Sequence, residues 1–300
     1  MKSSVQTNNL GLLEEVASGS CDAVRFGSEF CEYSMPTLNE LKKAYEIVNA
    51  KGKEFTYVTP RLSNGGIEKL RRQLTFLDKQ GKSDIVLNDY GALNILEGYP
   101  NLSPHLGRQM VRLPARSPWA RLLIKGGIFF KPGGKNVLTK GGFLKKRWYR
   151  RVFSSSSLDF QYTVELLLDH GVRRADVDWI PHAPSSFVFM KSKGFDLSVH
   201  LHLAPVAFTR RCHTARFLGE SSLKKCSRPC SARAFLLRNE LCDLSVWLNG
   251  NAVFNYTQPT PVELRNLKKG DFAEFVVTTN PITGMTSREK IDEFITLLKD

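Results

Sequence analysis

Six cysteines carry the most specific chemistry in this sequence: Cys21, Cys31, Cys212, Cys226, Cys230 and Cys242. Three of them fall within the 19 residues from 212 to 230, a clustering that indicates metal binding. The first residues lack the apolar core of a signal peptide, so we expect a cytoplasmic protein. Thiols in a reducing cytoplasm rarely form disulfides, and the clustered cysteines are therefore expected to bind a metal ion or cluster.

Four of the six cysteines lie on the carboxyl side of predicted strands. Cys31 follows a strand predicted at 22–26. Cys212 follows a later predicted strand, and the same loop continues to Cys226 and Cys230. In parallel α/β proteins this side carries the functional loops. Cys21 and Cys242 precede strands, and a five-residue strand would keep Cys21 roughly 16 Å from Cys31. Topology alone therefore selects Cys31, Cys212, Cys226 and Cys230.

Four thiolates suit either a tetrahedral zinc ion or an iron–sulfur cluster. The three residues between Cys226 and Cys230 make a wider spacing than the Cys-x-x-Cys of many structural zinc sites. Buried apolar cysteines without a metal are the third alternative. The residues by themselves leave zinc and iron–sulfur open.

Five motifs surround these cysteines and the predicted strand ends: Arg25-Phe-Gly27 with Glu29-Phe-Cys31, Asn88-Asp-Tyr-Gly91, Arg211-Cys-His-Thr-Ala-Arg216, Cys226-Ser-Arg-Pro-Cys230 and Trp247-Leu-Asn-Gly250. They resemble the collagenase-like peptidases, peptidase family U-32, and in particular their short UbiV-like branch, which acts in oxygen-independent ubiquinone biosynthesis. The similarity covers most of the chain except a basic segment, and the cysteine pattern is its most specific part.

The resemblance implies a [4Fe-4S] cluster held by one early cysteine and a late group of three, which map onto Cys31, Cys212, Cys226 and Cys230. It further implies a redox role in an anaerobic hydroxylation of a small-molecule substrate, in a complex with a related second subunit. The chain lacks the additional cysteines of the peptidase-named members, which argues against the larger RNA-modifying proteins of the family.

Three polar residues are candidates for catalysis. His200 and His202 alternate with aliphatic residues on one predicted strand, so both imidazoles would face one side, as a proton donor or substrate contact requires. Asp89 follows a predicted strand and could face the same cavity. Hydrogen-bonded core histidines and an ordinary aspartate turn are the alternatives. Arg211 and Arg216 lie on either side of Cys212 in the sequence. They could tune the charge of a cluster or hold an anionic substrate, and the alternative is that they are solvated surface residues.

The segment 108–153 is strongly basic. Between Arg108 and Arg151 there are 13 Lys/Arg and no Asp or Glu, which leaves 30 basic and 29 acidic residues for the rest of a chain of net charge +14. Seven aromatic residues are interspersed with these charges. The composition favours an anionic membrane surface or RNA as a partner, with a solvated insertion as the alternative.

The elements that must position these residues alternate between strand and helix. Strands are expected at 22–26, 54–58, 84–87, 186–190, 196–204, 244–248 and 272–278, and helices at 8–20, 37–48, 67–77, 91–98, 157–171 and 286–298. This order predicts a TIM-like (β/α) barrel, with a doubly wound open sheet as the alternative. We expect one domain over 1–300, with the basic segment as an insertion or crossover.

Hydrolytic and membrane-spanning classes receive no support from the sequence. There is no Gly-x-Ser-x-Gly and no His-Glu-x-x-His motif, and no run of 18 apolar residues. Cys212 and His213 are chain neighbours, which does not make a catalytic dyad. A peptidase is thus disfavoured, and the redox protein is the main expectation, with RNA modification or binding as the alternative.

Overall fold

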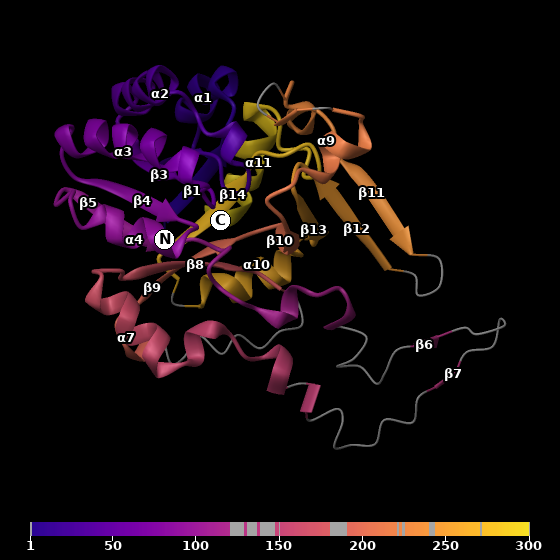
Figure 1. Ribbon diagram of the computed structural model, residues 1–300. Helices are drawn as coiled ribbons and strands as arrows, with labels where there is room; N and C mark the ends of the chain where they lie inside the picture. The colour runs from indigo at the N-terminus through magenta and orange to yellow at the C-terminus, as the bar shows by residue number, and fades with distance from the viewer. Residues whose placement is uncertain are drawn as a thin grey trace.

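A closed barrel of eight parallel strands forms the body of the protein (Figure 1). The structure is a computed structural model that describes residues 2–120, 129–130, 137–138, 148–149, 151–180, 191–220, 222–223, 226–239, 244–270 and 272–299. In barrel order the strands are β1 (Lys2–Thr7), β14 (Glu274–Thr278), β9 (Asp196–His200), β8 (Arg174–Asp178), β5 (Leu102–Leu106), β4 (Ser83–Leu87), β3 (Glu54–Val58) and β2 (Ala23–Gly27). The predicted TIM-like barrel is confirmed, and the open sheet is wrong.

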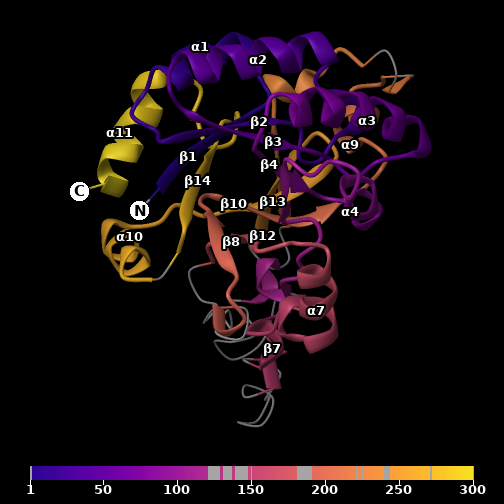
Figure 2. The ribbon, with the colours of Figure 1, turned by 90° about the vertical axis from the view of Figure 1, so that its left-hand side faces the viewer.

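Helices cover the outside of the barrel, and the two chain ends lie close together (Figures 1 and 2). Amphipathic sequences explain their positions, since the buried residues of α2 are Leu41, Ala44 and Val48, all on one side. Thr37 and Glu40 form the predicted capping box of that helix. The helices are α1 (Leu10–Ala17), α2 (Leu38–Ala50), α3 (Asn64–Lys79), α4 (Tyr90–Leu96), α7 (Gln161–Asp169), α10 (Pro261–Lys268) and α11 (Arg288–Lys299).

The barrel strands place apolar side chains outward, against the helices, and polar side chains inward. In β8, Ala175 and Val177 belong to the hydrophobic core, whereas Asp176 and Asp178 alternate with them and face the other way. The same alternation holds in the other strands that contribute Gln6, Arg25, Ser198, His200 and Glu274. The interior of the barrel is therefore charged and hydrogen-bonded rather than aliphatic.

A second, antiparallel sheet extends from the barrel between β9 and β14. Its order is β10 (Leu203–Phe208), β13 (Ala252–Tyr256), β12 (Leu244–Asn249) and β11 (Phe235–Asn239), with α9 (His213–Phe217) packed on β12. The single strand predicted at 196–204 is wrong, because it divides into β9 and β10. His202 causes the break, since its φ of 78° lies outside the strand region. The strand predicted at 244–248 exists as β12 but lies outside the barrel.

Three barrel strands, β1, β5 and β8, were not expected from the sequence. Their inward residues are polar and their apolar residues few, so they lack the aliphatic run that marks a buried parallel strand. In the observed barrel, β1, β5 and β8 complete the set of eight strands, and the predicted strand 244–248 is not among them. The segment 186–190 lies outside the described residues.

Most of the basic segment 108–153 also lies outside the described residues, apart from its ends and the short strands β6 (Phe129–Phe130) and β7 (Val137–Leu138). Two of its cations, Arg108 and Arg116, are buried and ion-paired. They are therefore not part of a solvated basic surface. No helix in the described part of the chain is long and apolar enough to span a membrane.

Candidate functional site

The four selected cysteines gather where the barrel meets the antiparallel sheet. Cys31 follows β2 and precedes a short 3-10 turn, and Cys212 is the N-cap of α9. Cys226 and Cys230 lie in the loop between α9 and β11. The amide of Ala215 donates to Cys212 Sγ at 3.4 Å, and that of Arg228 donates to Cys226 Sγ at 3.4 Å. Such N–H donors to sulfur are a common way to stabilise a thiolate or a cluster.

Cys31 links two cavities that together border three of these thiols. The larger cavity, of about 260 Å³, is lined by Cys31 and Cys230, and the smaller, of about 110 Å³, is lined by Cys31 and Cys212. Burial raises the pKa of Cys230 to about 12, and the neighbouring thiols Cys31, Cys212 and Cys226 add to this rise through their charge. Cys230 thus lies within electrostatic reach of the other three thiols.

The turn Asn249-Gly250-Asn251, between β12 and β13, ties the cysteine-bearing segments together. Asn249 Nδ2 donates to the carbonyl of Cys230 at 2.7 Å and to that of Arg233 at 2.9 Å. Asn251 Nδ2 donates to the carbonyls of Phe30, beside Cys31, at 2.8 Å and of Thr209 at 2.7 Å. Gly250 accepts from the amide of Thr214, in the first turn of α9, at 3.0 Å.

We call Asn249 and Asn251 the asparagine clamp. The sequence pointed to the segment Trp247–Gly250 as a motif but assigned no role to its amides. The signal was present, because two asparagines around a glycine form a turn with side-chain donors on both sides. Gly250 has φ of 63°, which a glycine adopts without strain.

The larger cavity opens at the carboxyl ends of the barrel strands. Thr7 ends β1 and Asn8 follows it, Ser28 follows β2, and Thr278 ends β14 with Asn280 two residues later. Glu29 and Arg108 also line it, so that it connects the polar interior to the cysteines. Hydroxyl and amide side chains share its wall with apolar ones such as Phe30, Phe254 and Met285, which suits a small molecule with both polar and apolar parts.

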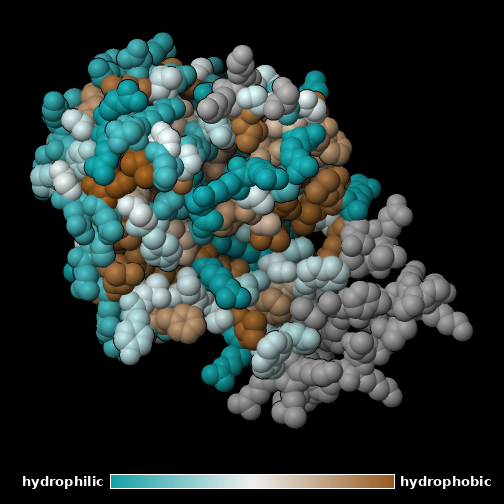
Figure 3. Space-filling model, in the orientation of Figure 1, coloured by the Kyte–Doolittle hydropathy of each residue, from teal (hydrophilic) through white to brown (hydrophobic). Residues whose placement is uncertain are grey.

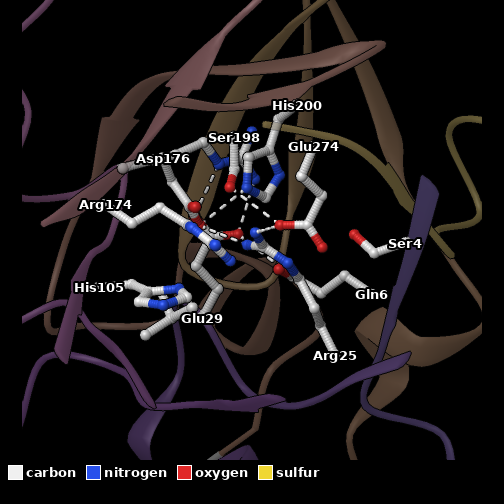
Figure 4. A network of polar contacts seen from close by, with 12 residues as sticks. Ser4, Gln6, Arg25, Glu29, His105, Arg174, Asp176, Ser198, His200 and Glu274 are labelled. Carbon is white, nitrogen blue, oxygen red and sulfur yellow. Dashed lines mark hydrogen bonds and ion pairs between the residues drawn. The ribbon is translucent and has the colours of Figure 1, made fainter. Parts of the chain in front are cut away.

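Below this cavity, Arg25 forms the centre of the interior network (Figure 4). It is fully buried, and its Nη1 lies 2.8 Å from Asp176 Oδ2 while its Nη2 pairs with Glu274. Ser198 Oγ donates to Glu274 Oε2 at 2.9 Å. Burial opposes the ionised form of Glu274, but the charge of Arg25 outweighs it and lowers the pKa of Glu274 to about 2. Both carboxylates therefore stay ionised at neutral pH.

Arg108 forms a second centre closer to the cavity. Its Nε and Nη2 bind both oxygens of Glu29, at 2.8 and 2.6 Å, and its Nη1 lies 2.7 Å from Asp178 Oδ1. Gln6 Nε2 donates to Glu29 at 2.9 Å, and Arg116 Nε pairs with Asp178 at 2.5 Å. Such buried charges are tolerated because each is paired. The three arginines and four carboxylates of the two centres leave one net negative charge.

His200 belongs to this network, as its predicted inward direction required. Its Nε2 lies 3.0 Å from Asp176 Oδ2, and its Nδ1 has no partner among the described residues. Burial and the positive charge of Arg108 lower the pKa of His200, although Asp176 opposes the shift. The imidazole is therefore neutral at physiological pH, with one nitrogen donating to Asp176.

The structure does not bring His202 and Asp89 to His200. The His202 ring packs 4.5 Å from the ring of Phe294 on α11, so the prediction that it shares a face with His200 is wrong. Burial lowers the pKa of His202 to about 4. Asp89 caps α4, and its two oxygens accept from the amides of Gly91 and Leu62. That is the turn chemistry given above as its alternative.

The chemistry of the donors bears on which metal group these residues fit. In the described part of the chain, no group of three or more His, Cys, Asp or Glu side chains is arranged to hold a metal ion. Four thiol donors suit both a tetrahedral zinc ion and an iron–sulfur cluster. The choice of a cluster therefore rests on the motif resemblance. Cys21 is buried beside Val16, before β2, and Cys242 lies outside the described residues.

Comparison with known proteins gives a likeness of fold. No family model and no curated protein matches the chain. Among solved structures, the fold is similar to that of the U32 peptidase Mk0906, with 12% sequence identity, a TM-score of 0.43 and coverage of 93% of both chains. A likeness at this identity concerns the fold alone, and at this TM-score neither family membership nor activity follows from it.

Proposed function

We propose that this protein is an iron–sulfur protein whose [4Fe-4S] cluster is held by Cys31, Cys212, Cys226 and Cys230. The observation that carries the proposal is that Cys31, Cys212 and Cys230, from segments up to 199 residues apart, line two adjoining cavities at the carboxyl mouth of the barrel, with Cys226 within electrostatic reach of Cys212 and Cys230. Buried thiols gathered in this way repel one another once ionised, and a cationic iron core removes that repulsion.

The cavity beside Cys31 and Cys230 supports a small-molecule substrate. Its hydroxyl and amide side chains would orient the polar part of a ligand by hydrogen bonds, and the paired Arg108 and Glu29 would fix the floor. His200 holds Asp176 in position by a hydrogen bond, and its imidazole is neutral among the charged side chains around Arg25 and Arg108. When bound, a cluster of this type supplies electron transfer or substrate activation.

The finer assignment follows from the motif resemblance. We propose a role in oxygen-independent hydroxylation, as part of a complex with a related second subunit, as in UbiV-like proteins. The sequence contains neither a Gly-x-Ser-x-Gly nor a His-Glu-x-x-His motif, so peptide hydrolysis has no support from either motif.

Anaerobic purification with iron and sulfide analysis tests the cluster. The wild type should contain about four irons and four sulfides per chain, with visible absorbance that bleaches in air. Cys212→Ala should lose most of the iron, while Cys21→Ala, which alters a buried thiol before β2, should keep it. Iron content that is equal in both variants, or stoichiometric zinc in place of iron, would contradict the proposal.

A further inference from the structure

A second concentration of positive charge surrounds the cysteines of the antiparallel sheet. Residues 209–239 contain eight Lys/Arg and one acidic residue, Glu220. Without these and without the basic segment, the rest of the chain has 22 basic and 28 acidic residues. The barrel itself is thus net negative, and the positive charge of this sheet is a local feature.

Part of this charge lies around the outer edge of β11 and the end of α9, an exposed region that we call the α9–β11 face: Arg216, Phe217, Arg233, Leu236, Leu237 and Arg238. On β11, Leu236 and Arg238 point to one side of the sheet and Leu237 to the other. The Phe217 ring lies 5.0 Å from the Phe235 ring, which sets the end of α9 beside the start of β11. Phe217 is 67% exposed, and the two leucines are 37% and 39% exposed. None of the three arginines forms a salt bridge with a described residue. Figure 3 shows hydrophobic and hydrophilic side chains side by side over this part of the molecule.

The backbone of β11 is available as well. Within the described residues β11 pairs only with β12, so its outer edge presents free N–H and C=O groups. Exposed leucines and phenylalanine beside arginine are the composition of a protein interface, which is enriched in aromatic residues and Arg and poor in Lys. A second copy of this chain, at net charge +14, would be repelled.

We propose that the α9–β11 face docks a small acidic electron-carrier protein of the ferredoxin or flavodoxin type. This rests on the proposed function, because the loop between α9 and β11 carries Cys226 and Cys230, and Cys212 begins α9. The charge is complementary, and the face adjoins the N-cap and loop that carry three of the four cysteines. The contact forms no covalent bond; the carrier gives up one electron to the group held by the cysteines and leaves in its oxidised form.

The test is binding of purified [2Fe–2S] ferredoxin and flavodoxin to the anaerobically purified protein over a salt series. The variant R216Q/R233Q/R238Q should weaken binding of at least one carrier roughly tenfold, with the loss largest at low salt. The control R71Q/R72Q/K79Q removes the same charge from α3, away from β11 in Figure 1, and should bind like the wild type.

The outcomes separate this inference from the cluster proposal. Equal weakening in both variants would mean unspecific attraction to a basic protein and would overturn the inference. Binding of polyadenylate RNA that depends on the same three arginines, with no carrier binding, would overturn it in favour of nucleic acid. Iron analysis of the same samples decides separately whether the cluster is present, because the binding measurement does not require electron transfer to it.

Discussion

Removing the donor of Asn251 should loosen the cysteine segments without opening the barrel. The Asn251 amide donates to two backbone carbonyls, of Phe30 and Thr209, and the residue is 7% exposed. Each such bond contributes about 0.5–1.5 kcal/mol net, so Asn251→Ala should lower the stability of this region by about 1–3 kcal/mol. Asn251→Asp should lower it more, because a carboxylate would face two carbonyl oxygens without a donor.

Hydrogen exchange resolved by peptide mass spectrometry measures this effect locally. We expect faster exchange in 209–239 and around Phe30, with unchanged exchange in β3 and β4, and a lower iron content after anaerobic purification. Asn255→Ala is the matched control, since Asn255 lies on β13 and its side chain bonds no other described residue. Unchanged exchange in Asn251→Asp would refute the role of the clamp.

Three further predictions concern the cysteines and the barrel interior. Cys226→Ala should remove most of the iron and lower the melting temperature, because the loop from 212 to 230 has few large apolar residues and depends on the metal group for its order. Full iron content with an unchanged melting temperature would count against Cys226 as a ligand. Arg108→Met should cost about 3–5 kcal/mol in denaturant unfolding, since it leaves Glu29 without its buried cation; a loss below about 1 kcal/mol would show that the pair is dispensable. Glu274 has a pKa of about 2 in the folded state against 4.5 for an ordinary glutamate, so its contribution of about 3 kcal/mol is present above pH 4.5 and is lost as the pH falls towards 2. Glu274→Gln should flatten this part of the stability–pH curve, and an unchanged slope would contradict the sign.

The elements that the sequence predicts correctly are those with a clear hydrophobic pattern. Helices such as α2 and α3 and strands such as β3 and β4 combine clear periodicity with ordinary caps, and they were predicted close to their observed bounds. The position of Cys31 after β2 also followed from this pattern. Where local sequence and burial agree, a single sequence is enough.

The failures occurred where buried charges and distant partners change the hydrophobic pattern. β8 reads Arg-Ala-Asp-Val-Asp, and its aspartates look like loop residues because a strand buried on both faces is normally aliphatic. Their partners, Arg25 and Arg108, come from distant strands, so no local signal reveals the pairing. The break between β9 and β10 at His202 also has no local signal, because polar and aliphatic residues continue to alternate through it in the sequence.

The antiparallel sheet leaves and re-enters the barrel at almost the same point. Leu203 pairs with Tyr256, and the amide of Thr257 donates to the carbonyl of His202 at 2.8 Å. β9 and β14, the barrel strands on either side of this excursion in the chain, hydrogen-bond directly to each other. The barrel therefore closes without the excursion, and its 54 residues from 203 to 256 form a module that a short linker could replace. Removing it would take three of the four thiols away and leave Cys31 alone on the barrel, so the shortened barrel would keep its fold and lose the proposed cysteine site.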